Sequence, residues 1–268
     1  MLKTLALIAL ALGAASHRPP PNVVTVTARD FAFELPASIP AGVTTFHLVN
    51  KGTFAHHMTI VRLDEGRTAA EALKAVMAIG RAPRPELMHP VGGPQSITPG
   101  VEGNATVVLE PGNYLAFCEV PGPDPAPHYM KGMAKAFTVT GPARGGALPK
   151  ADVALTLTEY DITFARPLTR GRHTIAVTNH GTQAHMVVFT RYPPGKGNSD
   201  FLAWAKDPRG RPGPGYTMGG VTELPPGATA TFTRNFIPGH YGMICFTPDA
   251  KDGKPHFMHG MSGEFDIP

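Results

Sequence analysis

Cysteine is scarce in this chain of 268 residues, which contains only Cys118 and Cys245. An even count in an oxidising compartment often signals a disulfide. These two cysteines, however, occupy equivalent positions in two similar halves of the chain, and a bridge would need their Cα atoms within about 7 Å of each other. A disulfide-stapled fold is therefore disfavoured, and metal ligation by the two sulfurs is the favoured interpretation.

Charge is sparse as well. Charged residues make up 16% of the sequence, the formal net charge is +4, and no run of five or more Lys and Arg residues occurs. Nucleic-acid-binding proteins and polybasic membrane-surface proteins depend on such clusters. We therefore expect no nucleic-acid partner and a mildly basic, solvated surface.

Long apolar runs are missing except near the N-terminus. Lys3 precedes the apolar segment Leu5–Leu12, and the small residues Gly13–Ala15 follow it. This order is typical of a secretory signal peptide, and the segment is too short for a membrane-spanning helix. Since no cysteine follows directly, a lipid anchor is not expected. We predict a signal peptide at residues 1–15 and an exported protein, periplasmic or extracellular, that begins near Ser16 and has no membrane span.

Glycine and proline, by contrast, are abundant, with 30 and 29 residues. They separate short segments in which apolar and small polar residues alternate, the pattern of half-buried strands. The same series of segments occurs twice. We predict an all-β fold of two Greek-key sandwich domains, at 22–140 and 151–268, with about seven strands each and a linker at 141–150. Paired segments include Val23–Phe33 with Val153–Phe164, and Thr44–Asn50 with His173–Asn179.

A short helical insertion is predicted in each half. Thr68 and Glu71 form a capping-box pattern ahead of an apolar periodicity in which Met77 is expected in the core. The corresponding segment of the second half is Ser199–Trp204, with weaker signals. The glycine pairs that follow, Gly92–Gly93 and Gly219–Gly220, are expected to form turns.

Each cysteine opens the same motif, in which a proline-rich loop is followed by Pro-His and then by Gly-Met. A second histidine ends the motif Asn-x-Gly-Thr-x-Ala-His in each half. Two imidazoles, one thiolate and one weak axial thioether are the ligands of a type 1 copper site. The candidate ligands are His56, Cys118, His128 and Met133 in the first half and His185, Cys245, His256 and Met261 in the second.

Two alternatives remain open from the sequence. His57 directly follows His56, and since neighbouring side chains on a strand face opposite sides, only one of them is expected in the site; the ungapped repeat favours His56. Zinc is the rival metal, but structural zinc sites rarely use methionine. Met130 and Met258 also recur, and we expect them to pack near the site.

These motifs resemble the cupredoxin, or blue copper, family over essentially the whole chain, as two tandem domains. The spacing His-x-x-x-Gly-Met is similar to the type 1 site of copper nitrite reductases, which also have a long loop between Cys and His. Here nine and ten residues intervene. The resemblance implies a Greek-key sandwich in each half and two copper ions per chain that cycle between Cu²⁺ and Cu⁺.

The copper reductases and oxidases of that family carry a histidine beside the cysteine, which relays electrons to a second copper centre. Here the neighbours are Phe117 and Glu119, and Ile244 and Phe246. We therefore expect that the chain contains no catalytic residues and catalyses no reaction of its own.

The leading hypothesis is an exported copper-binding electron-transfer protein, and the alternative is copper handling by buffering or delivery. We expect His128 and His256 near the surface, with a transient exported redox or copper-exchange partner docking on an apolar rim. That rim comprises Pro123, Pro125, Ala126, Pro127 and Pro255.

Overall fold

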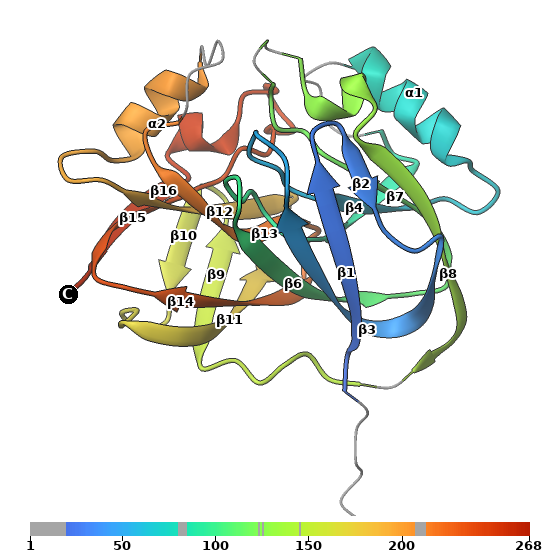
Figure 1. The fold of residues 1–268 in the computed structure, drawn as a ribbon, viewed down its shortest axis with the longest axis horizontal. Helices are drawn as coiled ribbons and strands as arrows, with labels where there is room; N and C mark the ends of the chain where they lie inside the picture. The colour runs from blue at the N-terminus through green and yellow to red at the C-terminus, as the bar shows by residue number, and fades with distance from the viewer. Residues whose placement is uncertain (1–19, 80–84, 123, 125, 145, 207–212) are drawn as a thin grey trace, which may run out of the picture.

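The computed structural model describes residues 20–268 apart from 80–84, 123, 125, 145 and 207–212 (Figure 1). The described residues form sixteen strands, two α-helices and two 3₁₀ helices, with eight strands on either side of residue 150. The predicted all-β class is confirmed. The predicted signal peptide lies outside the described residues. No helix among those described is long and apolar enough to cross a membrane.

The first half contains β1 (Asn22–Arg29), β2 (Ala32–Glu34), β3 (Ser38–Asn50), β4 (Thr59–Leu63), α1 (Ala69–Ile79), β5 (Met88–Gly92), β6 (Glu102–Leu109), β7 (Gly112–Phe117), η1 (His128–Lys131) and β8 (Ala134–Arg144). The second half contains β9 (Val153–Thr158), β10 (Asp161–Phe164), β11 (Gly171–Asn179), β12 (His185–Tyr192), α2 (Asn198–Ala205), β13 (Tyr216–Leu224), β14 (Thr229–Phe236), β15 (Gly239–Ile244), η2 (His256–His259) and β16 (Ser262–Ile267).

Each half has two packed layers. In the first half, the start of β3 pairs with β8 in parallel. The rest of β3 pairs with β6 in antiparallel orientation on one side and with β1 in parallel orientation on the other. One layer is therefore β2-β1-β3-β6 and the other is β3-β8-β7-β4-β5. In the second half the layers are β10-β9-β11-β14 and β13-β12-β15-β16. Alternating burial along β1, β9 and β11 shows why these residues form strands with one face in a core.

The two halves share one hydrogen-bonded sheet. Strand β14 pairs with β6 at Thr231 and Thr106. Beside this pair, the Asn104 side chain donates to the carbonyl of Thr233 and accepts from its N–H, both at 2.9 Å. A single apolar core cluster includes buried residues of both halves. The halves are therefore fixed to each other by backbone and core contacts.

A second seam joins the halves where residues 93–98 run beside β13. Isolated bridges pair Pro94 with Val221 and Ile97 with Met218. The glycine pairs predicted as turns lie here, and the prediction is wrong for both, since Gly92 is the last residue of β5 and Gly93 follows it without a turn. Gly219 and Gly220 lie inside β13 with φ of 109° and 125°, at an irregular register with β12. A Cβ on Gly220 would collide with the carbonyl of Val187, so the glycine permits a close backbone approach.

Two further predictions need correction. The segments Val23–Phe33 and Val153–Phe164 are not single strands but hairpins, β1-β2 and β9-β10, because Phe31 and Tyr160 adopt φ of 64° and 65°. The segment assigned to the linker also begins inside a strand, since β8 continues to Arg144.

The predicted capping box of α1 is confirmed. Thr68 N donates to the Glu71 carboxylate at 2.8 Å, and Glu71 N donates to Thr68 Oγ1 at 3.2 Å. The expectation for Met77 is wrong, since its side chain is 46% exposed, and Ala72 and Val76 supply the buried face of the helix.

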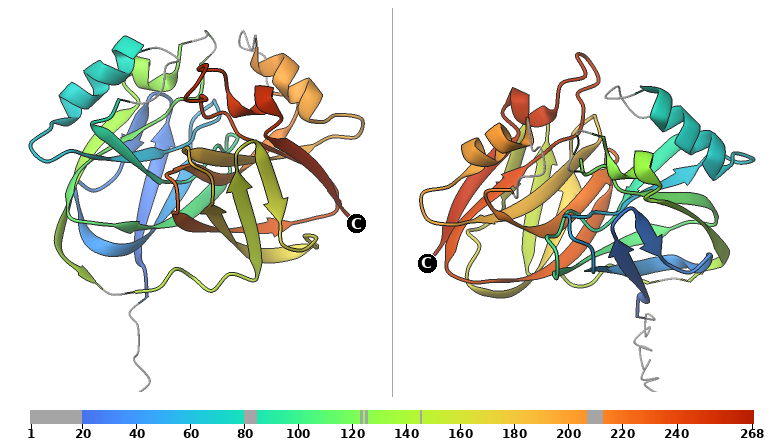
Figure 2. Two further views of the ribbon diagram at one scale, coloured as in Figure 1. Left: turned by 180° about the vertical axis from the view of Figure 1, so that it is seen from behind. Right: turned by 45° about the horizontal axis from the view of Figure 1, so that its top comes forward.

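Both Cys-to-Met loops lie at the same end of the molecule as α1 and α2 (Figure 1). In each half the α-helix packs beside the 3₁₀ helix of the loop (Figure 2). Val76 and Tyr129 share a buried cluster in the first half, and Phe201 and Phe257 share one in the second. The helical insertions therefore support the loops that carry the candidate ligands.

Candidate metal centres

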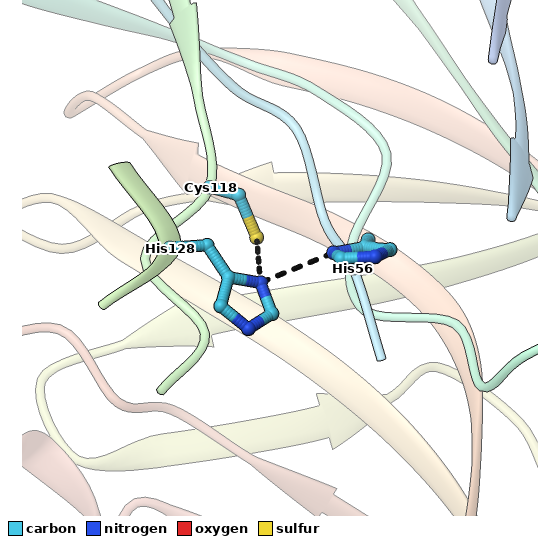
Figure 3. A group of neighbouring side chains, drawn as sticks. All are labelled: His56, Cys118 and His128. Atoms are coloured by element: carbon cyan, nitrogen blue, oxygen red, sulfur yellow. Dashed lines mark hydrogen bonds between the residues drawn. The ribbon is translucent and has the colours of Figure 1, made fainter. Parts of the chain in front are cut away.

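The structure brings six of the eight predicted ligands into two compact groups of donors. His56, Cys118 and His128 form one group, and His185, Cys245 and His256 form the other. Within each group the donor atoms lie within 4.8 Å of one another. All six side chains are fully buried. Figure 3 shows the sulfur of Cys118 and a ring nitrogen of His56 both directed at Nδ1 of His128.

The donor separations fit one metal ion in each group. Nδ1 of His128 lies 3.1 Å from Nδ1 of His56 and 3.6 Å from the sulfur of Cys118. The matching distances in the second group are 3.0 and 3.6 Å. Metal–nitrogen bonds of about 2.0–2.1 Å and a metal–sulfur bond of about 2.3 Å, at angles of about 100–120°, separate the donors by about 3.1–3.8 Å. Both groups fit a type 1 copper site, and the chain fits two copper ions.

The remaining predicted ligands, Met133 and Met261, are fully buried and belong to the same core cluster as the two cysteines. Cys118 N donates to the Met133 carbonyl, and Met133 N donates to the His128 carbonyl, both at 3.1 Å. The second half repeats these two bonds at the same length. The backbone of each loop thus holds its Cys, His and Met as neighbours.

A glycine in the left-handed region ends each 3₁₀ helix and turns the chain toward the methionine. Gly132 has φ of 103°, and Gly260 has φ of 100°. A side chain at these positions would be strained, which explains why the motif reads Gly-Met in both loops.

The first histidine of each site is positioned by the asparagine of its motif. Asn50 Nδ2 donates to the carbonyls of Phe54 and Ile97 at 2.8 and 2.9 Å, and its Oδ1 accepts from Gly52 N at 2.9 Å. Asn179 makes the same three bonds in the second half. Because the side chain spans the loop, it fixes the backbone that carries the histidine.

A carboxylate behind this histidine was missed by sequence reasoning. Asp30 Oδ1 lies 3.2 Å from His56 Nε2, and Glu159 lies 3.8 Å from His185 Nε2. When Nε2–H of His56 donates to Asp30, Nδ1 is left unprotonated and turned toward the other donors, as in many metal sites, whereas the Glu159 contact is too long for a hydrogen bond. An acidic residue directly follows the first strand of both halves, but nothing in the sequence ties it to a histidine more than 20 residues away.

Glycine makes this approach possible. A Cβ on Gly52 would overlap both Asp30 and His56, and a Cβ on Gly181 would overlap Glu159 and His185. The glycine of Asn-x-Gly-Thr is therefore a requirement of the site.

An aromatic ring covers the second histidine of each site. The Phe31 ring meets His128 edge-on at 5.2 Å between centroids, and Tyr160 meets His256 in the same manner at 5.6 Å. Both residues have positive φ, which is costly for an aromatic residue by about 1–3 kcal/mol and is found most often at functional sites. The hairpin turns that sequence analysis overlooked thus carry part of the site.

His128 and His256 were expected near the surface, but neither side chain reaches solvent. Their Nε2 atoms are buried and have no hydrogen-bond partner among the described residues. Met130 and Met258 were expected to pack near the site, and they are instead 47% and 56% exposed. In each loop the methionine faces outward, and the histidine two residues earlier is covered.

The surroundings of the two sites differ in charge. His128 is flanked by the rings of Phe31 and Phe54, and the Lys131 ammonium lies 5.0 Å above the Phe31 ring. His256 instead has a buried carboxylate, Asp249 Oδ2, at 3.6 Å from its Nε2.

The carboxylate of Asp249 is held in the ionised form. Tyr160 Oη donates to it at 2.7 Å and Gln183 Nε2 at 3.0 Å. These bonds hold the pKa of Asp249 well below its ordinary value. The second site therefore has an anion beside its outer histidine, where the first has aromatic rings and a lysine that is paired with Asp124 at 2.8 Å.

His57, the alternative to His56, lies outside the group of donors. Its Nε2 accepts from Glu119 N at 2.8 Å, and its Nδ1 lies 3.0 Å from Gln95 Oε1. Since Nε2 accepts a hydrogen bond, the ring is neutral and Nδ1 carries the proton.

The donors are neutral in the metal-free protein. Burial raises the pKa of Cys118 to about 12 and that of Cys245 to about 11. Burial, together with neighbouring histidines, lowers the pKa of His128 to about 3 and that of His185 to about 4. A metal ion that binds must therefore displace the proton of each thiol, whereas the imidazoles are ready to bind.

One further group of three candidate donors occurs among the described residues, formed by Asp249, Asp252 and His259. Asp252 and His259 are partly exposed and bond within their own loop, where Asp252 also accepts from Lys254 N at 2.9 Å. This group is explained by loop structure. Within the part of the chain that the structure describes, no second histidine-rich centre accompanies the two cysteine sites.

No protein-family model and no curated protein matches the sequence. Solved structures do match. Auracyanin B is 27% identical and covers 46% of this chain and 92% of its own, with a TM-score of 0.34. Auracyanin A, a "blue" copper protein of Chloroflexus aurantiacus, is 20% identical over 45% of this chain and all of its own, with a TM-score of 0.33.

The copper nitrite reductase of Nitrosomonas europaea is 16% identical over 93% of this chain and 94% of its own, with a TM-score of 0.28. All three TM-scores lie below 0.5, so the functional conclusion rests on the donor geometry of this chain.

Proposed function

We propose that this chain is an exported, copper-binding electron-transfer protein of the cupredoxin type, with one type 1 copper site in each half. The observation that carries the proposal is the convergence of two Nδ1 atoms and one cysteine sulfur, fully buried, in both halves. Bound copper supplies one-electron Cu²⁺/Cu⁺ chemistry. The residues that would hold it are His56, Cys118, His128 and Met133, and His185, Cys245, His256 and Met261.

Burial of the ligands favours electron transfer over copper delivery. A delivery site must expose a ligand so that an acceptor protein can displace it. Here the donors of both sites have no solvent exposure, and hydrogen bonds from Asn50 and Asn179 fix the loops behind them. A rigid, dry site needs little rearrangement when its metal changes oxidation state. Buffering or delivery of copper remains the alternative that the experiments below separate.

We assign no turnover to the chain itself. Enzymes of this type pass electrons through a histidine beside the cysteine, and the flanking residues here are Phe117, Glu119, Ile244 and Phe246. We infer export from the leader-like sequence at residues 1–15. A transient exported partner would dock over the Cys-to-Met loops, where Ala126, Pro127 and Pro255 are half-buried.

A visible spectrum of the purified protein after addition of Cu²⁺ and buffer exchange tests the proposal. We expect two bound copper ions and a strong thiolate-to-copper band. Cys118→Ser and Cys245→Ser should each remove one copper site and its share of the band, and the double variant should remove the band completely. Folding of each variant is checked by circular dichroism.

The proposal is overturned if copper is not retained, or if it is retained without the thiolate band. Rapid loss of Cu⁺ to a competing chelator, with slow or absent oxidation and reduction by exported redox proteins, would support copper handling instead.

A further inference from the structure

Residues next to both sites meet at the seam between the halves. Gln95 N donates to the Gly220 carbonyl at 3.3 Å, and Thr222 N donates to the Gly93 carbonyl at 2.9 Å. The residue that follows the first histidine ligand contacts this seam in each half. His57 follows His56 and Met186 follows His185, and Gln95 bonds to both of their side chains.

The first part of a bonded series leads from site one to the seam. Glu119, whose backbone N is joined covalently to Cys118, donates to His57 Nε2 at 2.8 Å. Nδ1–H of His57 consequently donates to Gln95 Oε1 at 3.0 Å. Ser96 N also donates to this oxygen, at 2.8 Å. Two donors therefore identify Oε1 as the acceptor end of the amide and direct its NH₂ group toward the second half.

The second part leads from the seam to site two. Gln95 Nε2 donates to the thioether sulfur of Met186 at 3.2 Å. Met186 N in turn donates to the sulfur of Cys245 at 3.5 Å. In the second half the series ends on the sulfur of Cys245, a predicted copper ligand. In the first half it ends on Glu119 N, which is joined by a peptide bond to the predicted ligand Cys118. His57, Gln95 and Met186 are at most 6% exposed, so water is excluded along the series.

The series is not a by-product of the duplicated fold. The position equivalent to Gln95 is Thr222, whose hydroxyl is buried and has no hydrogen-bond partner among the described residues. The position equivalent to His57 is Met186. Packing alone would be served by apolar residues, because burying an amide and an imidazole is costly unless both are bonded. The seam nevertheless contains one series of hydrogen-bonded polar groups, which links the two sites and has no equivalent related by the repeat.

From this arrangement we infer that Glu119 N, His57, Gln95 and Met186 form the electron path between the two coppers, so that the chain stores and relays electrons internally. The inference rests on the proposed function. In each transfer one electron leaves Cu⁺ at one site, which becomes Cu²⁺, and reaches Cu²⁺ at the other, which becomes Cu⁺. No proton moves and no bond forms or breaks. The path ends at the cysteine of each site, the ligand that shares its electrons most strongly with copper.

The experiment uses the full chain loaded with two coppers. A pulse of reductant that supplies less than one electron per chain gives mixed-valence protein. The redistribution of that electron is followed by absorbance, and rapid-freeze paramagnetic resonance assigns the two Cu²⁺ sites. The native protein should show a redistribution phase whose rate does not depend on protein concentration. Gln95→Leu and Met186→Leu should each slow this phase several-fold, with copper content and visible spectra unchanged.

Thr222→Val is the matched control, since it removes a buried hydroxyl from the same seam without touching the series, and its rate should equal the native rate. The metal-free protein gives a separate readout. Nitrogen NMR should show His57 protonated on Nδ1 alone, and Gln95→Leu should shift that nitrogen signal.

Equal rates in the native protein, Gln95→Leu and Met186→Leu would overturn the inference, as would the absence of a concentration-independent phase in a native protein that holds two type 1 coppers. Failure to bind copper would instead overturn the proposed function.

Discussion

At the scale of single residues, a carboxylate orients the first histidine of site one. Asp30 Oδ1 lies 3.2 Å from His56 Nε2, and the carboxylate accepts hydrogen bonds from Thr53 N at Oδ1 and from Thr53 Oγ1 at Oδ2. Outer partners of this kind contribute about 10–100-fold to metal affinity. We therefore expect Asp30→Asn to weaken copper binding at site one by about 10-fold or more, as measured by chelator competition.

The control for this substitution is Glu34→Gln. Glu34 lies on the same hairpin, and within the described part of the chain its carboxylate forms an ion pair with the exposed Arg29 at 2.8 Å. Unchanged affinity in Asp30→Asn would show that the carboxylate plays no part in holding His56.

The carboxylate of the second site predicts a dependence of stability on pH. Burial disfavours ionisation of Glu159, but hydrogen bonds from Thr182 and Gln183 outweigh it and lower its pKa to about 2. The unfolded-state pKa is about 4.3. Because the folded pKa is the lower one, this stabilisation is complete above about pH 4.3 and is lost as the pH falls toward about 2.

Urea unfolding of the metal-free protein at pH 7 and pH 3 measures this effect. Glu159→Gln should lose less stability than the native protein between these two pH values. Parallel losses in the two proteins would show that Glu159 does not contribute.

At the scale of elements, the loop before β4 and the end of β1 must approach closely. A Cβ on Gly52 would overlap both Asp30 and His56. Overpacking of this kind typically costs about 1–3 kcal/mol. We expect Gly52→Ala to lower the free energy of unfolding by about that amount and to weaken copper binding at site one while site two is unaffected.

Unfolding titrations and separate loading of the two sites check this result. Gly213→Ala is a suitable control, since the nearest atoms that an added Cβ would meet there belong to the Trp204 ring, at an ordinary contact distance of 3.6 Å. Equal copper affinity of site one in Gly52→Ala and the native protein would contradict the argument.

The elements also show what the sequence reveals about this fold. Helix α1 was predictable because Thr68 and Glu71 lie one turn apart and cap it locally. The hairpins β1-β2 and β9-β10 were missed because their turns lack the Asn-Gly or Asp-Gly signal of such loops. Phe31 and Tyr160 hold positive φ there, supported by packing against histidines that are distant in sequence. Strain of this kind is invisible to a local pattern.

The candidate ligands were predictable for the opposite reason. Cysteine, histidine and methionine lie on one loop in the same order in both halves, and the spacing His-x-x-x-Gly-Met occurs twice, so the candidate donors can be read from the sequence. The carboxylates behind it were not predictable, because Asp30 is 26 residues from His56 and only the packing of two strands brings them together. The burial of His128 and His256 was likewise decided by rings from another hairpin.

At the scale of the whole molecule, the two halves share one architecture but place different charges around their sites. An ionised carboxylate beside a ligand stabilises Cu²⁺ relative to Cu⁺ by Coulomb attraction, and a nearby cation does the reverse. Asp249 lies 3.6 Å from His256, whereas the Lys131 ammonium above the ring that covers His128 is paired with Asp124 at 2.8 Å, so the difference rests on the Asp249 charge. We therefore expect a lower reduction potential at site two than at site one.

Redox titration of the two-copper protein, followed by visible absorbance and paramagnetic resonance, measures both potentials. Asp249→Asn should raise the potential of site two and leave that of site one unchanged, because it removes the charge while keeping a group that Tyr160 and Gln183 can bond. Tyr160→Phe is the comparison variant, since it removes one of these bonds and keeps the carboxylate. If Asp249→Asn leaves the reduction potential of site two unaltered, the charge of Asp249 does not cause the difference between the two potentials.

This order of potentials gives the inferred path a direction. Electrons should run from site two, through Met186, Gln95 and His57, to site one, so that a donor is oxidised at the second half and an acceptor is reduced at the first. In mixed-valence protein at equilibrium, Cu⁺ should therefore reside mainly at site one, and Asp249→Asn should shift its distribution toward site two without slowing the exchange through Gln95. If Cu⁺ resides mainly at site two in the native protein, the predicted direction of electron flow is wrong. The path itself is tested separately by the rate measurements on Gln95→Leu.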